Sequence, residues 1–91
     1  VDKYVVMYII KNNAAFNRIG FSVSKKIGNS VVRNKIRRQM KEIYRGFANN
    51  TKSGHDIVFT ARAGIGSVNF SVIENSMITI LKRAKLQKSE E

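Results

Sequence analysis

A dense cluster of cationic side chains lies between residues 25 and 45. This window contains eight of the 17 lysines and arginines of the chain, but only one acid, Glu42. Lysine and arginine side chains bind anions, and phosphate groups are the anions that suit them best. The candidates are all cationic or amide side chains: Lys25, Lys26, Asn29, Arg33, Asn34, Lys35, Arg37, Arg38, Lys41 and Arg45. A solvated charged surface is the ordinary alternative, but the lack of compensating acids favours a polyanion-binding surface.

The same window predicts the helix that must display these side chains. Its apolar residues recur at spacings of four, four, three and four, which is one helical stripe: Val32, Ile36, Met40, Ile43 and Phe47. The helix is expected from about Ser30 to Phe47, with Asn29 or Ser30 as the N-cap after Gly28. Cations in the first turns, such as Arg33 and Lys35, oppose the helix dipole. They are better explained by a bound phosphate than by helix stability.

The charge of the whole chain also favours an anionic partner. The chain has 91 residues, a formal net charge of +11, a pI of about 10.5 and no cysteine. This length predicts a single domain over residues 1–91, and 43% hydrophobic residues are normal for a globular protein. So strong a positive bias predicts a polyanionic partner, with nucleic acid first and an anionic membrane surface second. No apolar run reaches the roughly 20 residues that span a membrane, and no signal-peptide pattern is present, so a cytoplasmic location is expected.

Catalytic and metal-binding constellations are missing from the sequence. The single histidine, His55, lies in a polar stretch, and the acids that could pair with it are scattered without metal-ligand spacing. Gly64 and Gly66 lack the other residues of a dinucleotide or P-loop motif. We therefore predict no catalytic side chain and no metal site in this chain, and interpret it as a nucleic-acid-binding module.

Two strands are expected before the basic helix. Residues 1–10 form an almost continuous apolar run, which predicts a central strand covered on both faces. Tyr4 and Tyr8 share one face of this strand, where they could be core residues or a stacking platform for bases, and their pattern alone favours core. Residues 18–24 predict a second strand, joined to the first as a hairpin. Its small residues Gly20, Ser22 and Ser24 fall on one side.

The remaining segments complete a two-layer arrangement. Residues 56–62 predict a third strand, and Asn69 is a plausible N-cap for a last helix with this buried stripe: Phe70, Ile73, Met77, Ile80, Leu81 and Ala84. The cations Lys82 and Arg83 suit the C-terminal end of that helix and are not counted as an RNA site. The order β-β-α-β-α predicts an α+β fold, a two-layer sandwich of helices on a small central sheet. A helix between parallel strands normally makes a right-handed crossover.

The run from Ile19 to Arg38 resembles the bacterial ribonuclease P protein family. That family carries a Gly-hydrophobic-Ser-Val-Ser-Lys-Lys strand, then Gly-Asn-Ala-Val, then an Arg-Asn-Arg/Lys-Ile-Lys/Arg-Arg signature. The corresponding residues here are Gly20-Phe21-Ser22-Val23-Ser24-Lys25-Lys26, Gly28-Asn29-Ser30-Val31 and Arg33-Asn34-Lys35-Ile36-Arg37-Arg38. The spacing is kept over about twenty consecutive residues, and the third strand and last helix also fit the family.

The resemblance implies a subunit of an RNA–protein endonuclease that removes 5′ leaders from precursor tRNA. The catalytic RNA subunit and Mg²⁺, bound mainly by that RNA and the substrate, would perform the hydrolysis. The protein would bind the catalytic RNA through the signature helix and hold the single-stranded leader in a cleft beside the sheet. The implied leader-binding residues are Tyr8, Val6, Ser22, Ser24 and Arg37. The family also implies a left-handed crossover through the basic helix.

One departure from the family concerns the N-terminus. Family members normally begin with a helix and a short strand, whereas this chain begins at Val1 inside an apolar run. We expect the missing segment to weaken leader binding and to expose apolar surface, which would favour dimerisation or strand exchange. Two alternatives stay open from the residues alone. One is a non-enzymatic RNA-binding protein with a ribosomal-protein-like fold, and the other is a basic DNA-binding or membrane-surface module.

Overall fold

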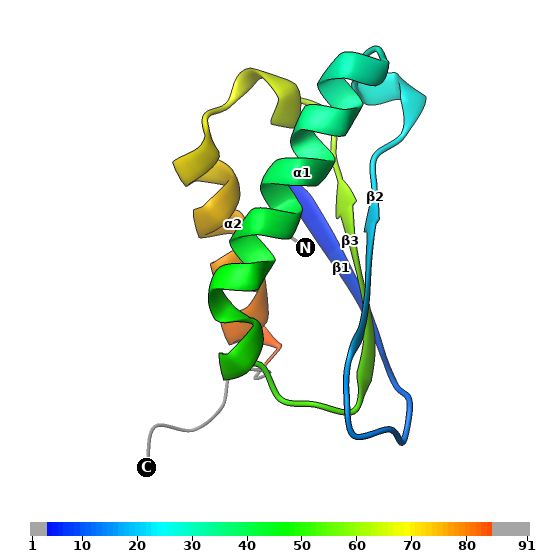
Figure 1. The fold of residues 1–91 in the computed structure, drawn as a ribbon. Coiled ribbons are helices and arrows are strands. Elements are labelled where there is room, and N and C mark those ends of the chain that lie inside the picture. Colours follow the sequence, from blue (N-terminus) through cyan, green and yellow to red (C-terminus); the bar gives the residue numbers. More distant parts are fainter. Residues whose placement is uncertain (1–3, 85–91) are drawn as a thin grey trace.

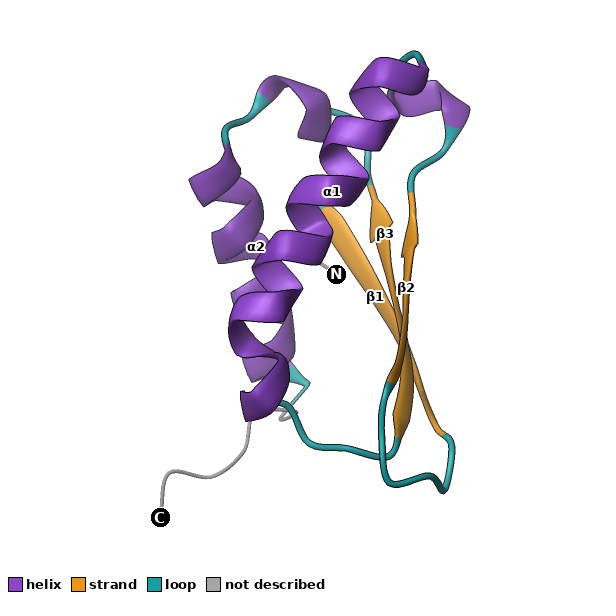
Figure 2. Ribbon diagram, in the orientation of Figure 1, coloured by secondary structure: helices purple, strands orange, loops and turns teal. Residues whose placement is uncertain are grey.

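Two helices cover one face of a three-stranded sheet in the computed structural model (Figure 1, Figure 2). The structure describes residues 4–84. In chain order its elements are β1 (Val5–Lys11), β2 (Arg18–Ser22), α1 (Ser30–Phe47), β3 (His55–Ala61) and α2 (Phe70–Arg83), with short 3-10 turns at Lys25–Ile27, Ala48–Asn50 and Ile65–Ser67. The predicted α+β class, the β-β-α-β-α order and the bounds of the basic helix are confirmed.

The arrangement of the strands differs from the prediction. The sheet order is β1-β3-β2, so β3 is the central strand and β1 lies at an edge of the described sheet. The predicted hairpin is also wrong, because β1 pairs antiparallel with β3 and β2 pairs parallel with β3. The continuous apolar run of β1 suggested burial on both faces, yet Tyr8 is 61% exposed and Ile10 is 71% exposed. Only one face of β1 contributes to the core.

The helix α1 connects the two parallel strands β2 and β3, as the crossover arguments assumed. It packs beside α2 on the same side of the sheet (Figure 1). The left-handed path that the family implies for this crossover stays a prediction.

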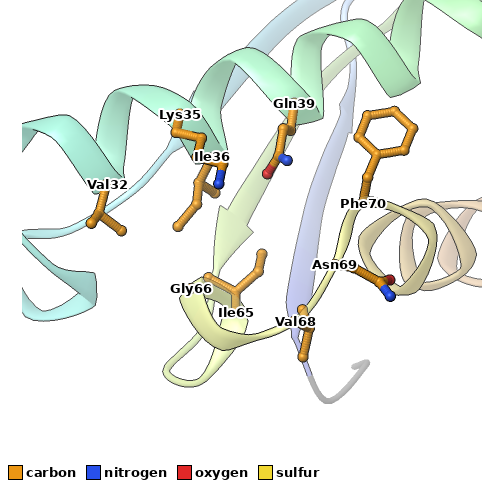
Figure 3. Close-up of a pocket in the computed structure, with 9 residues that line it drawn as sticks. All are labelled: Val32, Lys35, Ile36, Gln39, Ile65, Gly66, Val68, Asn69 and Phe70. Carbon is orange, nitrogen blue, oxygen red and sulfur yellow. The ribbon is translucent and has the colours of Figure 1, made fainter.

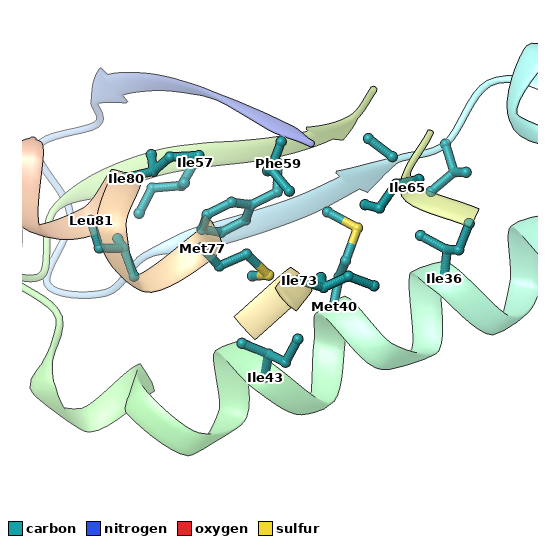
Figure 4. Close-up of a cluster of buried hydrophobic side chains, with 13 residues drawn as sticks. Ile36, Met40, Ile43, Ile57, Phe59, Ile65, Ile73, Met77, Ile80 and Leu81 are labelled. Carbon is teal, nitrogen blue, oxygen red and sulfur yellow. The ribbon is translucent and has the colours of Figure 1, made fainter. Parts of the chain in front are cut away.

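The core lies between the sheet and the two helices (Figure 4). From α1 it receives Ile36, Met40 and Ile43, which are three of the five predicted stripe residues, while Val32 and Phe47 pack at its margin. The stripe of α2 is confirmed at four positions: Ile73, Met77, Ile80 and Leu81. Phe70 is half-buried, and the prediction was wrong for Ala84, which is exposed because the helix ends at Arg83.

The aromatic centre of this core is Phe59 on β3, which has no exposed surface. Its ring centroid lies 5.8 Å from that of Phe21 on β2 and 5.9 Å from that of Tyr44 on α1. The central strand therefore joins the sheet to the inner face of the basic helix, and this contact fixes which side of α1 faces outward.

An ion pair at one end of the sheet holds the β1–β2 connection. The Arg18 Nε donates a hydrogen bond to Asp56 Oδ1 over 2.8 Å, and the Asn12 Nδ2 donates to the same oxygen over 2.9 Å. The hydrogen bond from Arg18, then that from Asn12, and the positive charge of Arg18 lower the pKa of Asp56 below its usual value. The carboxylate is therefore favoured in its charged form by the folded protein.

This arrangement predicts a pH-dependent contribution to stability. Because the pKa of Asp56 is depressed in the folded state, its contribution is complete above the unfolded value of about 3.9 and disappears as the pH falls through the lower folded value. The substitution Asp56→Asn should lower stability at pH 7 and flatten the loss of stability below about pH 4. Urea denaturation between pH 2 and 7 would measure this, and an acid-induced loss as steep in the variant as in the parent would contradict it.

Candidate nucleic-acid interface

The local sequence explains why α1 begins where it does. The side-chain oxygen of Asn29 accepts a hydrogen bond from the Val32 backbone N–H over 3.0 Å, which makes Asn29 the N-cap. The preceding turn, Lys25–Ile27, is closed by a hydrogen bond from the Ile27 N–H to the Ser24 carbonyl. Lys25 and Lys26 are both exposed on this turn. The loop thus places two cations immediately before the first turn of the helix, where the backbone N–H groups that Asn29 does not cap remain free.

The outer side of α1 carries the predicted cations. Six of the ten candidate residues are helical and cationic: Arg33, Lys35, Arg37, Arg38, Lys41 and Arg45. All are exposed except Arg33 and Arg37, which are half-buried. No acid among residues 4–84 forms an ion pair with any of them. These six cations are therefore unpaired within the described residues, and we call them the cationic face.

Two arginines of the cationic face, Arg33 and Arg37, are half-buried, and one of them has a side-chain hydrogen bond. The Arg37 Nη1 donates a hydrogen bond to the Asn34 side-chain oxygen over 3.1 Å, one helical turn away. The Nε of Arg33 is enclosed and has no hydrogen-bond partner within the described structure. Fixing the stem of an arginine lowers the entropy that its guanidinium loses when it binds a phosphate.

The second candidate surface is the open face of the sheet, which the helices do not cover (Figure 2). The strand register aligns its side chains in three rows across β1, β3 and β2: Val6, Thr60 and Ser22, then Tyr8, Val58 and Gly20, then Ile10, Asp56 and Arg18. The predicted leader-binding residues Val6, Tyr8 and Ser22 therefore share one surface. Tyr8 is exposed, so the interpretation of this tyrosine as a core residue was wrong.

The other two predicted leader residues lie elsewhere. Ser24 is exposed but follows the end of β2, next to Lys25. Arg37 belongs to α1, which packs on the face of the sheet that carries Phe59, whereas Tyr8 pairs with Val58 on the other face. The structure does not bring Arg37 together with Tyr8, and its role at the leader stays a prediction.

Sequence reasoning missed two parts of these surfaces. Val58 and Thr60 alternate with buried residues of β3, and Val58 lies directly between Tyr8 and Gly20. That alternation could have been read from the sequence, but the neighbours of β3 could not. Gln39 and Phe70 also border a cavity beside α1, and only the packing of α2 reveals it.

The acids and the histidine of the described structure do not gather into a metal-binding cluster. Within residues 4–84, no three side chains of histidine, aspartate or glutamate come close enough together to hold a metal ion. The His55 Nδ1 is buried without a hydrogen-bond partner, and its backbone N–H donates to the Asn17 side-chain oxygen over 2.9 Å. In the same part of the chain, neither helix is long and apolar enough to cross a membrane.

Comparisons with known proteins agree on one family. The family model described as Ribonuclease P matches residues 1–85. The ribonuclease P protein component of Lachnoclostridium phytofermentans is 47% identical over 90 residues, covering 99% of this chain and 78% of the relative. That of Alkaliphilus metalliredigens is 45% identical over 85 residues, covering 93% of this chain and 77% of the relative.

Solved structures show the same agreement. The ribonuclease P protein of Staphylococcus aureus superimposes with a TM-score of 0.88 at 34% identity, over 97% of this chain and 81% of that one. The protein from Thermotoga maritima gives a TM-score of 0.84 at 30% identity, over 91% of this chain and 79% of that one. The mixed sheet with two helices on one side is therefore shared with these proteins.

Proposed function

The chain belongs to the ribonuclease P protein family, whose members are subunits of a ribonucleoprotein endoribonuclease, and from this we propose which RNA each of its two surfaces binds. The cationic face of α1, with Lys25, Lys26, Asn29 and Asn34, binds the catalytic RNA. The open face of the sheet binds the 5′ leader of precursor tRNA. Family membership favours this function over that of a non-enzymatic, ribosomal-protein-like RNA-binding protein.

The observation that carries the proposal is the uncompensated charge of the cationic face. The apolar stripe of α1 packs against the core, so the cationic side is the one turned toward solvent and a partner. No acid of the described chain neutralises that side. Several arginines on a rigid helix suit the regularly spaced phosphates of a folded RNA.

Leader binding is supported by the chemistry of the open face. Tyr8 offers an exposed aromatic ring for stacking on an unpaired base, and Val58 extends the apolar surface beside it. Ser22 and Thr60, in the adjacent row, can donate hydrogen bonds to sugar or phosphate oxygens. A single strand presents its bases to such a surface, whereas a duplex does not.

The reaction itself is assigned to the RNA. The described chain offers no acid cluster for a divalent ion, so we propose that Mg²⁺ is bound mainly by the catalytic RNA and the substrate. The ion would supply the hydrolytic chemistry, and this chain would position the substrate. The cytoplasm is the compartment that we propose for this work, and dimerisation or strand exchange through exposed apolar surface stays a prediction.

The leader site can be tested by comparing precursor tRNA with and without its leader. In the complex with a bacterial catalytic RNA, Tyr8→Ala should weaken binding of leader-bearing substrate by about tenfold, because stacking on an aromatic ring is worth about 1–3 kcal/mol per base. Binding of tRNA without a leader should not change, and Tyr8→Phe should behave like the parent.

The control is Phe16→Ala, which also removes an exposed aromatic ring, from the β1–β2 loop. It should leave leader-dependent binding unaltered. Equal losses with and without the leader, or equal losses in the two alanine variants, would remove the open face from the leader site.

A further inference from the structure

A cavity of about 270 Å³ lies where the N-terminal half of α1 passes the segment that leads into α2 (Figure 3). Its apolar wall is formed by Val32 and Ile36 from α1 and by Ile65 and Val68 from the opposite segment. Ile36 and Ile65 are almost completely buried, at 2% and 1% exposure. The cavity thus has a firm apolar floor that belongs to the core of the protein.

The rim of this cavity is polar and aromatic. Gln39 and Lys35, which also belongs to the cationic face, lie one turn apart on α1, and both line the cavity opposite the segment 65–70 (Figure 3). Neither side chain has a hydrogen-bond or ion-pair partner within the described residues. The half-buried ring of Phe70 borders the cavity from the start of α2, next to Asn69. Asn69 uses its side-chain oxygen as the N-cap of α2, accepting from the Val72 N–H over 3.2 Å.

We propose that this cavity binds one unpaired nucleotide of the catalytic RNA. A nucleobase has flat faces for the apolar wall and the Phe70 ring, and a polar edge that needs both donors and acceptors. The amide of Gln39 supplies both, and Lys35 supplies a cation for the adjoining phosphate. This inference rests on the proposed function, because the cationic face brings the RNA backbone to the mouth of the cavity.

A single glycine allows the cavity to be reduced without disturbing the fold. A Cβ atom added at Gly66 would lie 3.6 Å from Val32 Cγ1 and 3.9 Å from Ile36 Cδ1, both ordinary contact distances. These two side chains line the cavity, so Gly66→Ala places a methyl group inside it. A Cβ atom at Gly46, on the C-terminal half of α1, would meet nothing within 4 Å. Gly46→Ala is therefore the matched control.

The first experiment uses nucleoside 5′-monophosphates and ribose 5-phosphate as probes, monitored by NMR of the protein. The nucleotides should shift the side-chain amide signals of Gln39 and the ring signals of Phe70, whereas ribose 5-phosphate should shift mainly signals of Lys35. Gly66→Ala should abolish the base-dependent shifts, and Gly46→Ala should retain them. Shifts that are the same with ribose 5-phosphate, or that persist unchanged in Gly66→Ala, would overturn the proposal.

The second experiment measures affinity for a bacterial catalytic RNA. Gly66→Ala and Gln39→Ala should each weaken binding by about five- to 100-fold, the range expected for one stacked base. The dependence on salt should not change, because neither substitution removes a charge. If both variants bind like Gly46→Ala while Arg33→Ala with Arg37→Ala still weakens binding, this inference is wrong and the docking role of the cationic face stands.

Discussion

The double substitution Arg33→Ala with Arg37→Ala is expected to weaken binding of the catalytic RNA by roughly ten- to 100-fold near physiological salt. Both residues lie on the cationic face, one turn apart, and both are half-buried, with Arg37 hydrogen-bonded to Asn34. Each lost phosphate contact should also reduce the slope of log affinity against log salt by about one unit. Filter binding or fluorescence anisotropy over a range of salt concentrations would measure both effects.

The matched control for this experiment is Lys82→Ala with Arg83→Ala at the end of α2. It removes the same two charges from a chain of net charge +11, so any effect of overall charge is equal in the two double variants. Only the α1 variant should reduce the slope of log affinity against log salt, by about two units. An unchanged slope in that variant would exclude Arg33 and Arg37 from the RNA interface.

The largest effect on folding is expected from Phe59→Ala, which should destabilise the protein by about 3–5 kcal/mol. Phe59 is completely buried and contacts rings on β2 and α1, so its removal leaves a cavity between the sheet and the basic helix. A domain of this size is stable by only about 5–15 kcal/mol, so the variant should be close to unfolding. RNA affinity should fall with it, because the cationic face depends on the packing of α1.

Phe16→Ala again provides the control, since it makes the same chemical change at a side chain that is 62% exposed. Its free energy of unfolding should stay within about 0.5 kcal/mol of the parent value. Urea denaturation followed by circular dichroism would compare the two variants. Similar destabilisation by both would show that the core is not organised around Phe59.

The basic helix could be predicted from the sequence almost completely. Its apolar spacing determines which side packs inward, and Asn29 determines where the helix starts, and both are local properties. The structure confirmed the bounds Ser30–Phe47 and the N-cap. Asn69 was predicted in the same way as the N-cap of α2, where its side chain also accepts a backbone hydrogen bond.

The sheet could not be predicted equally well, because strand order depends on contacts between distant residues. The apolar run of β1 resembles a central strand, but burial on both faces requires partners that periodicity does not identify. The pairing of Tyr8 with Val58 joins residues that are far apart in the chain. For the same reason, residues of the open face were predicted only on β1 and β2, and the contribution of β3 was missed.

The cavity beside α1 could not be predicted from the sequence at all. Gln39 has no distinctive signal within a helix of many charged residues, and Phe70 was interpreted only as part of the buried stripe of α2. Their relation depends on how α2 and the turn Ile65–Ser67 pack against α1. A cavity is produced by tertiary packing, so only the structure could show this one.

Cleavage of precursor tRNA by a bacterial catalytic RNA at low Mg²⁺, measured with and without this chain, would show whether the chain acts as the protein subunit of ribonuclease P. We expect the chain to raise the rate of cleavage at the 5′ end of the tRNA, and Lys82→Ala with Arg83→Ala to act like the parent. Arg33→Ala with Arg37→Ala should need a much higher protein concentration for the same gain. If the parent chain binds the RNA without stimulating cleavage, or if the two double variants are indistinguishable, the proposed role of the cationic face in ribonuclease P is contradicted.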